Sequence, residues 1–195
     1  MKIGVLALQG AFAEHRKILE LLEAESFEIR QKRDFEAQPA DGYILPGGES
    51  TVMGKLLREL DLFEPLQSVI SQGIPVFGTC AGLLLLAKSI ENDPSVYLGA
   101  MDIVARRNAY GRQLGSFAVD GTFADQGIIP MVFIRAPYIQ DWGGQVEILS
   151  QVNGKAVAAR QRNMLVTAFH PELTNCTTVH QYFLNMIKRS RCTHE

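Results

Sequence analysis

The fold is decided by residues 74–83, which read Ile74-Pro75-Val76-Phe77-Gly78-Thr79-Cys80-Ala81-Gly82-Leu83. The apolar run at 74–77 predicts a short buried strand, and the apolar run at 81–90 predicts a helix that follows almost at once. A strand that passes into a helix through a glycine-flanked turn is typical of the nucleophile elbow, with cysteine here in the place of serine. The sequence therefore predicts an α/β fold in which Cys80 is held at the end of a central strand.

The first half of the chain repeats this alternation of strand and helix. Apolar runs predict strands at residues 2–8, 27–31 and 42–45, and amphipathic patterns predict helices at 11–25, 51–60 and 62–72. Residues 32–41 are polar and predict an irregular link. This alternation indicates βαβ units and a central, mostly parallel sheet with helices on both faces.

The second half predicts strands without long helices between them, at residues 101–106, 116–119, 129–135, 146–150 and 164–169. Asn153-Gly154 predicts a type I′ turn that joins residues 145–152 and 155–160 into an antiparallel hairpin. A closing helix is expected at 174–188, with Val179, Phe183 and Ile187 on one face. We expect one domain, residues 1–195, because chains divide only when ~250–300 residues outgrow a single core.

Composition excludes several classes of protein. The net charge is −2, from 19 basic and 21 acidic residues, and the chain lacks the basic run that nucleic-acid binding needs. The longest uncharged apolar stretch, residues 74–87, is shorter than the roughly 18 residues of a membrane span. The first residues do not resemble a signal peptide. Three scattered cysteines without a C-x-x-C pair indicate free thiols and a cytoplasmic location.

Cys80 is the candidate nucleophile. Gly78 and Gly82 allow close backbone packing around it, and the start of the following helix favours a thiolate. The alternative for an isolated cysteine is a buried structural thiol. The glycines and the strand–turn–helix context favour the catalytic interpretation.

His170-Pro171-Glu172 supplies a candidate base. Side chains two residues apart on an extended chain point to the same side, so the carboxylate of Glu172 can orient the imidazole of His170. Pro171 places the triplet at the end or edge of a strand. The motif alone also fits a loop histidine with a solvated glutamate. Together with Cys80 it predicts a Cys–His–Glu triad.

A glycine-rich loop, Pro46-Gly47-Gly48-Glu49-Ser50, follows the predicted strand at 42–45. Two adjacent glycines permit positive φ and expose N–H groups, which suits an oxyanion hole. Ser50 or Thr51 can cap the next helix, and an ordinary strand-to-helix turn is the alternative. The loop lacks the spacing of a phosphate-binding P-loop, and no G-x-G-x-x-G dinucleotide motif is present.

Other candidate residues carry weaker signals. Arg106, Arg107 and Arg112 stand out, as does Arg135, which follows an apolar strand and is placed to grip a carboxylate. Cys176 and Cys192 have no glycine neighbours. The four histidines, at positions 15, 170, 180 and 194, show no metal-ligand spacing.

Taken in order, these motifs resemble the class I, triad-type glutamine amidotransferases of flavodoxin-like α/β fold. Within that class they are similar to the family of glutaminase subunits of pyridoxal 5′-phosphate synthase, over nearly the whole chain. The segments that carry the finer resemblance are Leu8-Gln9-Gly10-Ala11, Leu45-Pro46-Gly47-Gly48-Glu49-Ser50-Thr51, Arg107-Asn108 with Gly111-Arg112-Gln113, Phe133-Ile134-Arg135-Ala136-Pro137 and Phe169-His170-Pro171-Glu172-Leu173.

The resemblance implies a role for each matched residue. Cys80 would attack the side-chain amide of L-glutamine, His170 would transfer protons and Glu172 would orient His170. The N–H groups of Gly48 and Ala81 would form the oxyanion hole. The glutamine-binding residues implied are Gly47, Gly48, Glu49, Ser50, Arg107, Ile134 and Arg135.

The family also implies a partner. Ammonia would pass to a separate (β/α)8-barrel synthase subunit in a large hetero-oligomer that makes pyridoxal phosphate, while this chain would need no cofactor and no metal. Two alternatives remain. One is a non-catalytic binding module of the same fold. The other is a different cysteine hydrolase or the glutaminase subunit of another class I amidotransferase, such as that of histidine biosynthesis.

Overall fold

The computed structural model describes residues 1–107 and 115–192. Arg112 and the other motif residues at 108–113 therefore lie outside the described residues. Within residues 1–107 and 115–192, no helix has the length and apolar character needed to cross a membrane.

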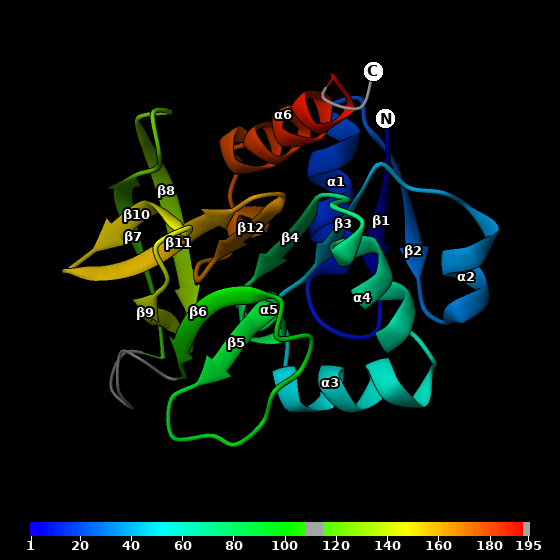
Figure 1. Cartoon of the computed structure of the whole chain (residues 1–195). Coiled ribbons are helices and arrows are strands. Elements are labelled where there is room, and N and C mark those ends of the chain that lie inside the picture. Colours follow the sequence, from blue (N-terminus) through cyan, green and yellow to red (C-terminus); the bar gives the residue numbers. More distant parts are fainter. Residues whose placement is uncertain (108–114, 193–195) are drawn as a thin grey trace.

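The first half of the chain forms the parallel part of the sheet (Figure 1). Its elements are β1 (Lys2–Leu6), α1 (Phe12–Leu21), β2 (Glu25–Ile29), α2 (Lys32–Ala37), β3 (Gly42–Leu45), α3 (Ser50–Glu59), α4 (Phe63–Ser71), β4 (Val76–Thr79) and α5 (Ala81–Leu86). The four strands lie in the order β2-β1-β3-β4 and pair in parallel. The carboxyl ends of β3 and β4 therefore lie side by side at one edge, where the glycine-rich loop and Cys80 follow them.

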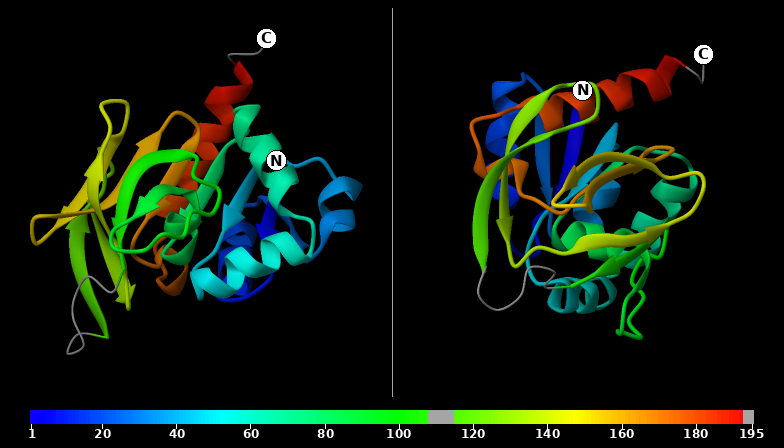
Figure 2. Two further views of the ribbon diagram at one scale, coloured as in Figure 1. Left: turned by 60° about the horizontal axis from the view of Figure 1, so that its bottom comes forward. Right: turned by 90° about the vertical axis from the view of Figure 1, so that its left-hand side faces the viewer.

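The second half extends the same sheet on the far side of β4 (Figure 2). Its elements are β5 (Ala87–Ile90), β6 (Met101–Arg106), β7 (Ser116–Thr122), β8 (Ile128–Ile134), β9 (Tyr138–Trp142), β10 (Glu147–Val152), β11 (Lys155–Gln161), β12 (Met164–Thr167), the 3-10 helix η1 (Pro171–Leu173) and α6 (Thr178–Cys192). β12 pairs in parallel with β4, and β11 pairs antiparallel with β12. β7 and β8 form a separate antiparallel pair.

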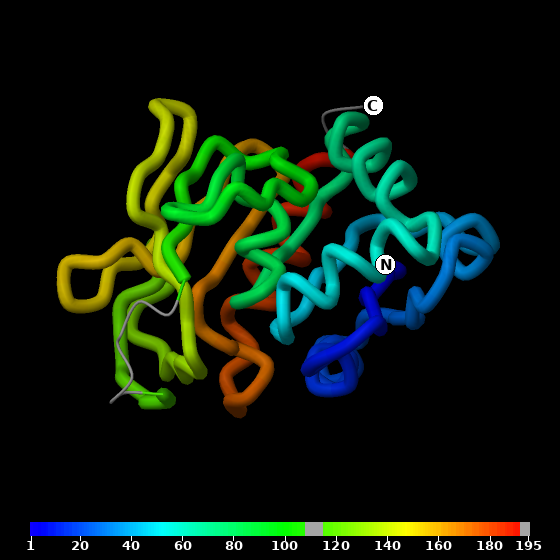
Figure 3. Tube along the Cα trace, turned by 90° about the horizontal axis from the view of Figure 1, so that it is seen from below, coloured from blue at the N-terminus to red at the C-terminus, as the bar shows by residue number. Residues whose placement is uncertain are grey.

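Helices cover both faces of the sheet. α1 and α4 lie on opposite sides of it (Figure 3). α6 lies on the side of α1, because the ring of Phe77 on β4 packs against both His15 of α1 and His180 of α6. The predicted apolar face of α6 is confirmed, since Val179, Phe183 and Ile187 are each no more than 1 % exposed. One hydrophobic cluster joins both halves of the chain.

The predicted hairpin is also confirmed. β10 and β11 pair antiparallel across Asn153 and Gly154. These residues have φ angles of 51° and 74°, so both central residues of the turn have the positive φ that a type I′ turn requires.

Several predicted elements differ from the structure. The run at 81–90 is not one helix, because α5 ends at Leu86 and residues 87–90 form β5. The polar link at 32–41 contains α2, which begins with a reciprocal capping box between Gln31 and Asp34. β4 begins two residues later than predicted, and α6 begins at Thr178 rather than at residue 174. β9 was not predicted at all.

Candidate active site

Cys80 lies in a strained turn between β4 and α5, with φ 48° and ψ −97°. Its N–H donates to the carbonyl of Thr167 on β12 over 2.8 Å, which fixes the turn to the neighbouring strand. A Cβ atom on Gly78 would lie 2.6 Å from the carbonyl carbon of Gly82, and one on Gly82 would lie 2.1 Å from the carbonyl oxygen of Leu45. Both glycines are therefore required by close packing, as the elbow motif predicts.

The base candidate stands just beyond β12. His170 Nδ1 lies 2.7 Å from Glu172 Oε1, and the side chain of Glu172 is fully buried. The pairing agrees with the sequence prediction, but its structural explanation was wrong. Residues 171–173 form a 3-10 helix instead of extended chain, and Pro171 is at its start. The N–H of His170 donates to Val132 on β8 over 2.8 Å, which holds the residue at the pocket wall.

Two hydrogen-bond partners control the charge of His170. Burial alone would lower the pKa of its imidazole, but hydrogen bonds with Cys80 and Glu172 outweigh burial and raise the pKa to about 10. At neutral pH the ring therefore carries a proton next to the sulfur of Cys80. Cys80 Sγ also lies 3.9 Å from the carbonyl oxygen of Ile134, at the end of β8.

The glycine-rich loop serves close approach, not positive φ. The sequence suggested that the two glycines are there to allow positive φ, and this explanation is wrong, because neither Gly47 nor Gly48 has a positive φ. A Cβ on Gly47 would lie 2.3 Å from Cε1 of His170, so a side chain there would displace the imidazole. The carbonyl of Gly47 accepts the N–H of Ala11 over 3.3 Å, which joins the loop to the segment that leads into α1.

Glu49, and not Ser50 or Thr51, caps α3. Its carboxylate accepts the N–H groups of Thr51 and Val52 at 3.3 and 2.9 Å. Partial burial raises the pKa of Glu49, but these N–H donors and the charge of Arg107 reverse that effect, so the pKa is lowered overall. The N–H of Glu49 donates to Gln9 Oε1 over 3.1 Å, a contact that sequence reasoning missed.

The two arginines of the predicted site differ in their surroundings. The guanidinium of Arg107 donates to Asp93 at 3.0 Å, to the hydroxyl of Tyr97 at 3.1 Å and to the hydroxyl of Ser50. Arg135 follows β8, as predicted, with φ 43° and an exposed side chain. Its guanidinium has no partner among the described residues, so it is free to meet an anion.

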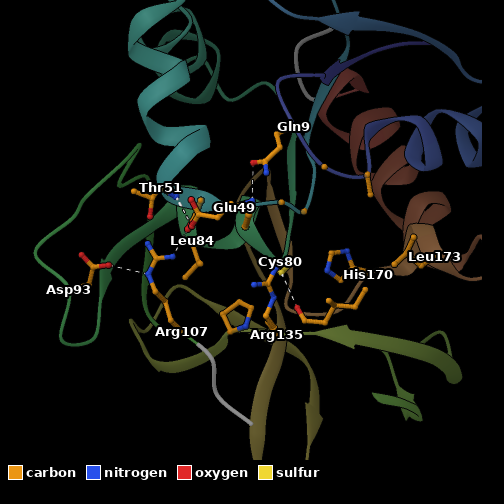
Figure 4. A pocket seen from close by; sticks show the side chains of 18 residues that line it. Gln9, Glu49, Thr51, Cys80, Leu84, Asp93, Arg107, Arg135, His170 and Leu173 are labelled. Atoms are coloured by element: carbon orange, nitrogen blue, oxygen red, sulfur yellow. Dashed lines mark hydrogen bonds and ion pairs between the residues drawn. The ribbon is translucent and has the colours of Figure 1, made fainter. Parts of the chain in front are cut away.

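These elements enclose one pocket of about 530 Å³ (Figure 4). The predicted residues that line it are Gly47, Gly48, Glu49, Ser50, Cys80, Ala81, Arg107, Ile134, Arg135 and His170. Glu172 lies behind His170, outside the lining. The volume is that of a small-molecule site. The structure therefore brings the whole predicted set to one place.

Sequence reasoning missed a second group of residues behind the triad. His15 and His180, which lie far apart in the sequence, contact each other, and Nε2 of His15 lies 3.5 Å from Oε2 of Glu172, the carboxylate that binds His170. No cluster of three His, Cys, Asp or Glu side chains in the described part of the chain is arranged to hold a metal ion. Histidine spacing in the sequence gave no signal of this group, since it depends on α1 and α6 lying together.

Comparison with known proteins agrees with this geometry. The SNO glutamine amidotransferase family matches residues 5–189. The chain belongs to this family. A family member from Haemophilus influenzae (strain PittEE), named "Pyridoxal 5′-phosphate synthase subunit PdxT", is 57 % identical over 190 residues, which are 96 % of this chain and 99 % of the relative. A protein of the same name from Streptococcus pneumoniae (strain ATCC 700669 / Spain 23F-1) is also 57 % identical, over 96 % and 98 % of the two chains. The resemblance to glutaminase subunits of pyridoxal 5′-phosphate synthase is confirmed, and with it the activity class.

Solved structures confirm the fold. One described as "Crystal structure of glutamine amidotransferase" superposes with a TM-score of 0.90 at 41 % identity, over 95 % of this chain and 98 % of that one. A putative GMP synthase protein from Thermoplasma acidophilum superposes with a TM-score of 0.73 over 100 % of this chain and 97 % of that one. At 16 % identity the second neighbour bears on the fold alone. The predicted α/β architecture of class I glutamine amidotransferases is therefore correct.

Proposed function

We propose that this glutamine amidotransferase hydrolyses L-glutamine at Cys80 and delivers the ammonia to a (β/α)8-barrel synthase subunit that makes pyridoxal 5′-phosphate. The observation that carries the proposal is the buried His170–Glu172 pair, 2.7 Å apart, beside a cysteine in a strained elbow on the pocket wall. In this arrangement a nucleophile, a proton carrier and an orienting carboxylate meet at one substrate-sized pocket.

In the first half of the reaction, the thiol of Cys80 passes its proton to His170, and the resulting thiolate attacks the side-chain carbonyl carbon of glutamine. The oxygen becomes an oxyanion, which the N–H groups of Gly48 and Ala81 stabilise. Ala81 is the first residue of α5, and N–H groups of a first helical turn have no partner within their own helix. His170 then gives its proton to the leaving nitrogen, the C–N bond breaks, and ammonia leaves a γ-glutamyl thioester on Cys80.

In the second half, water attacks the thioester carbonyl. His170, now neutral, accepts the proton of that water, the C–S bond breaks, and glutamate leaves. Glu172 holds the imidazole in one orientation through both steps. The α-amino and α-carboxylate groups of glutamine lie toward Glu49, Ser50, Arg107, Ile134 and Arg135. Arg135 is the cation for the carboxylate, because its guanidinium is unpaired among the described residues.

The chemistry and the names of the relatives, which call them subunits of a synthase, support the proposal of a partner. Free ammonia is lost to protonation and diffusion in water, so a glutaminase of this kind works beside the enzyme that uses its product. We place the pair in the cytoplasm, where the thiol of Cys80 stays reduced. We also propose that residues 1–195 act as one glutaminase domain.

The test uses Cys80→Ala assembled with the synthase subunit. We expect this complex to make no pyridoxal phosphate from glutamine but to make it at a near-normal rate from added ammonium salt. The reason is that glutamine hydrolysis and pyridoxal phosphate synthesis share only ammonia. Product absorbance with each nitrogen source is the measurement, and Cys176→Ala, which alters a free thiol outside the pocket lining, is the matched control. Synthesis from glutamine by Cys80→Ala would mean that Cys80 is not the nucleophile. Failure with ammonium in an assembled complex would mean that the chain does more than supply nitrogen.

A further inference from the structure

The triad carboxylate has one oxygen whose interactions the mechanism above does not explain. Oε1 of Glu172 binds His170, while Oε2 is buried and makes no hydrogen bond among the described residues. Burying an unpaired carboxylate oxygen is costly. Nε2 of His15 lies 3.5 Å from Oε2, and the side chains of both residues are fully buried.

His15 is itself held by a second buried histidine. Its Nδ1 lies 2.8 Å from Nε2 of His180, and its Nε2 lies 3.2 Å from the hydroxyl oxygen of Thr79. Phe77 packs edge-on against both imidazole rings, with centroids 6.0 and 5.7 Å away. Burial lowers the pKa of both histidines, His180 to about 3, so both rings are neutral. Each ring therefore has one N–H and one bare nitrogen.

The contacts select one of the two possible proton arrangements. If Nδ1 of His15 carried the proton, the bare Nε2 would face the carboxylate of Glu172, and the Nδ1–H of His180 would be a buried donor with no partner. If Nε2 of His15 carries the proton, it points toward Thr79 and Glu172, and Nδ1 accepts from Nε2–H of His180. The one bare ring nitrogen of the pair without a hydrogen-bond donor is then Nδ1 of His180, which indeed makes no hydrogen bond within the described residues. The second arrangement leaves no buried donor unpaired and sets no lone pair against a carboxylate.

We propose that His15 and His180 are positioning residues for the triad, in which His180 fixes the tautomer of His15 and His15 offers an Nε2–H donor to the free oxygen of Glu172. The carboxylate is then held from both sides, by His170 on Oε1 and by His15 on Oε2. A carboxylate held in this way keeps His170 aligned with Cys80. This inference rests on the proposed function, because it gives His15 its role through Glu172.

Replacing His15 by glutamine and by asparagine distinguishes the effect of losing the hydrogen-bond donor from the effect of losing the ring. The amide nitrogen of glutamine can occupy the place of imidazole Nε2, whereas that of asparagine occupies the place of Nδ1. Both variants remove the ring, so both disturb packing around Phe77, but only His15→Gln keeps a donor toward Glu172. Glutamate release is measured in the complex with the synthase subunit over a range of glutamine concentrations.

We expect His15→Asn to lower kcat about 10- to 100-fold, the loss that follows removal of an outer hydrogen-bond partner at metal sites. The KM for glutamine should stay within about twofold, because His15 lies outside the pocket lining, and His15→Gln should recover most of kcat. In a Glu172→Ala background His15→Asn should have no further effect, because the two residues act as a unit. Three results would overturn the proposal. The first is an equal loss of kcat in His15→Asn and His15→Gln, and the second is a wild-type kcat in His15→Asn. The third is an undiminished effect of His15→Asn on kcat in the Glu172→Ala background.

Two further measurements keep the test decisive. Nitrogen NMR of the full chain should find the proton of His15 on Nε2, and a proton on Nδ1 would contradict the inference. If His15→Asn does not fold, His180→Gln against His180→Asn repeats the comparison, because only glutamine retains a donor at the Nε2 position. Cys80→Ala is included throughout. Wild-type glutamate release by Cys80→Ala would refute the proposed function, whereas an inactive Cys80→Ala with a fully active His15→Asn would refute only the role of His15.

Discussion

At the scale of single residues, the chemistry depends on how three side chains share charge. His170 lies between the sulfur of Cys80 and the carboxylate of Glu172, and both neighbours favour its protonated form. Burial opposes them, because it disfavours a charged ring. Removing either neighbour therefore lowers the pKa of the group that must carry protons in both steps of glutamine hydrolysis.

The first prediction concerns this charge. Cys80→Ala removes a hydrogen bond that favours the imidazolium, so the pKa of His170 should fall from about 10. An NMR titration of the imidazole protons measures it. Cys176→Ala is the control and should leave the His170 titration unchanged. An unchanged His170 pKa in Cys80→Ala would show that the two side chains do not interact in solution.

The second prediction ranks the base and its orienting carboxylate. His170→Ala should lower glutamate release by at least the ~10²- to 10⁴-fold of general acid–base catalysis. Glu172→Ala should leave more activity, because the proton carrier remains and only its orientation is lost. Rates for the two variants in the complex decide this. A wild-type rate for either variant would reject the triad assignment.

At the scale of elements, the site depends on how closely β3, β4 and α5 approach. Gly82→Ala would place a Cβ atom 2.1 Å from the carbonyl oxygen of Leu45, so α5 or β3 must move. Such overpacking typically costs about 1–3 kcal/mol. Gly144→Ala is the control, since a Cβ there meets nothing within 4 Å and its φ is not positive. Urea unfolding should show a clear loss for Gly82→Ala and almost none for Gly144→Ala. Equal midpoints would contradict the packing argument.

The elements that the sequence predicted well are those with local signals. Strand β3 and the hairpin turn at Asn153 were predicted from short patterns whose physical reason is contained in those residues. The apolar run at 81–90 has no such signal for its end, because a buried helix and a buried strand look alike in sequence. α5 stops where Ala87 takes φ −58° and ψ 139°, a backbone change that composition does not show.

The same distinction applies to the site. Cys80, His170 and Glu172 could be predicted because each belongs to a short motif with a chemical purpose. His15 and His180 could not, because 165 residues separate them and only the packing of α1 against α6 joins them. The cap of α3 was assigned to the wrong residues for a similar reason. Glu49 reaches the helix N–H groups only in the conformation that the loop adopts beside Gln9.

At the scale of the whole molecule, the buried histidines link stability to pH. Burial lowers the pKa of His15 and His180 in the folded state, that of His180 to about 3, so below roughly pH 6.5 the unfolded chain binds more protons than the folded chain. The free energy of unfolding should therefore fall on acidification, by up to ~1.4 kcal/mol per pH unit for each histidine. His170 acts in the opposite sense: its contribution is complete below about pH 6.5 and is lost as pH rises toward 10.

Urea unfolding of the wild type and of His180→Gln at several pH values between 4 and 6.5 tests this linkage. Replacing His180 removes one of the groups that take up a proton on unfolding, so the variant should lose less stability per pH unit. Parallel curves for the two proteins would show that His180 titrates normally when folded. A difference in unfolding free energy between the two proteins that appeared only at alkaline pH would also contradict a lowered pKa of His180.

The position of β12 between β4 and β11 has a consequence for the order in which the protein is made. Cys80 leaves the ribosome long before residues 164–172, so the nascent chain carries its nucleophile without its base. Until β12 is synthesised, β4 is an open sheet edge with unpaired N–H and C=O groups, and such edges invite pairing with other chains. The last strand to enter the sheet thus closes that edge and brings His170 to Cys80. Hydrolysis of glutamine cannot begin before the sheet is complete.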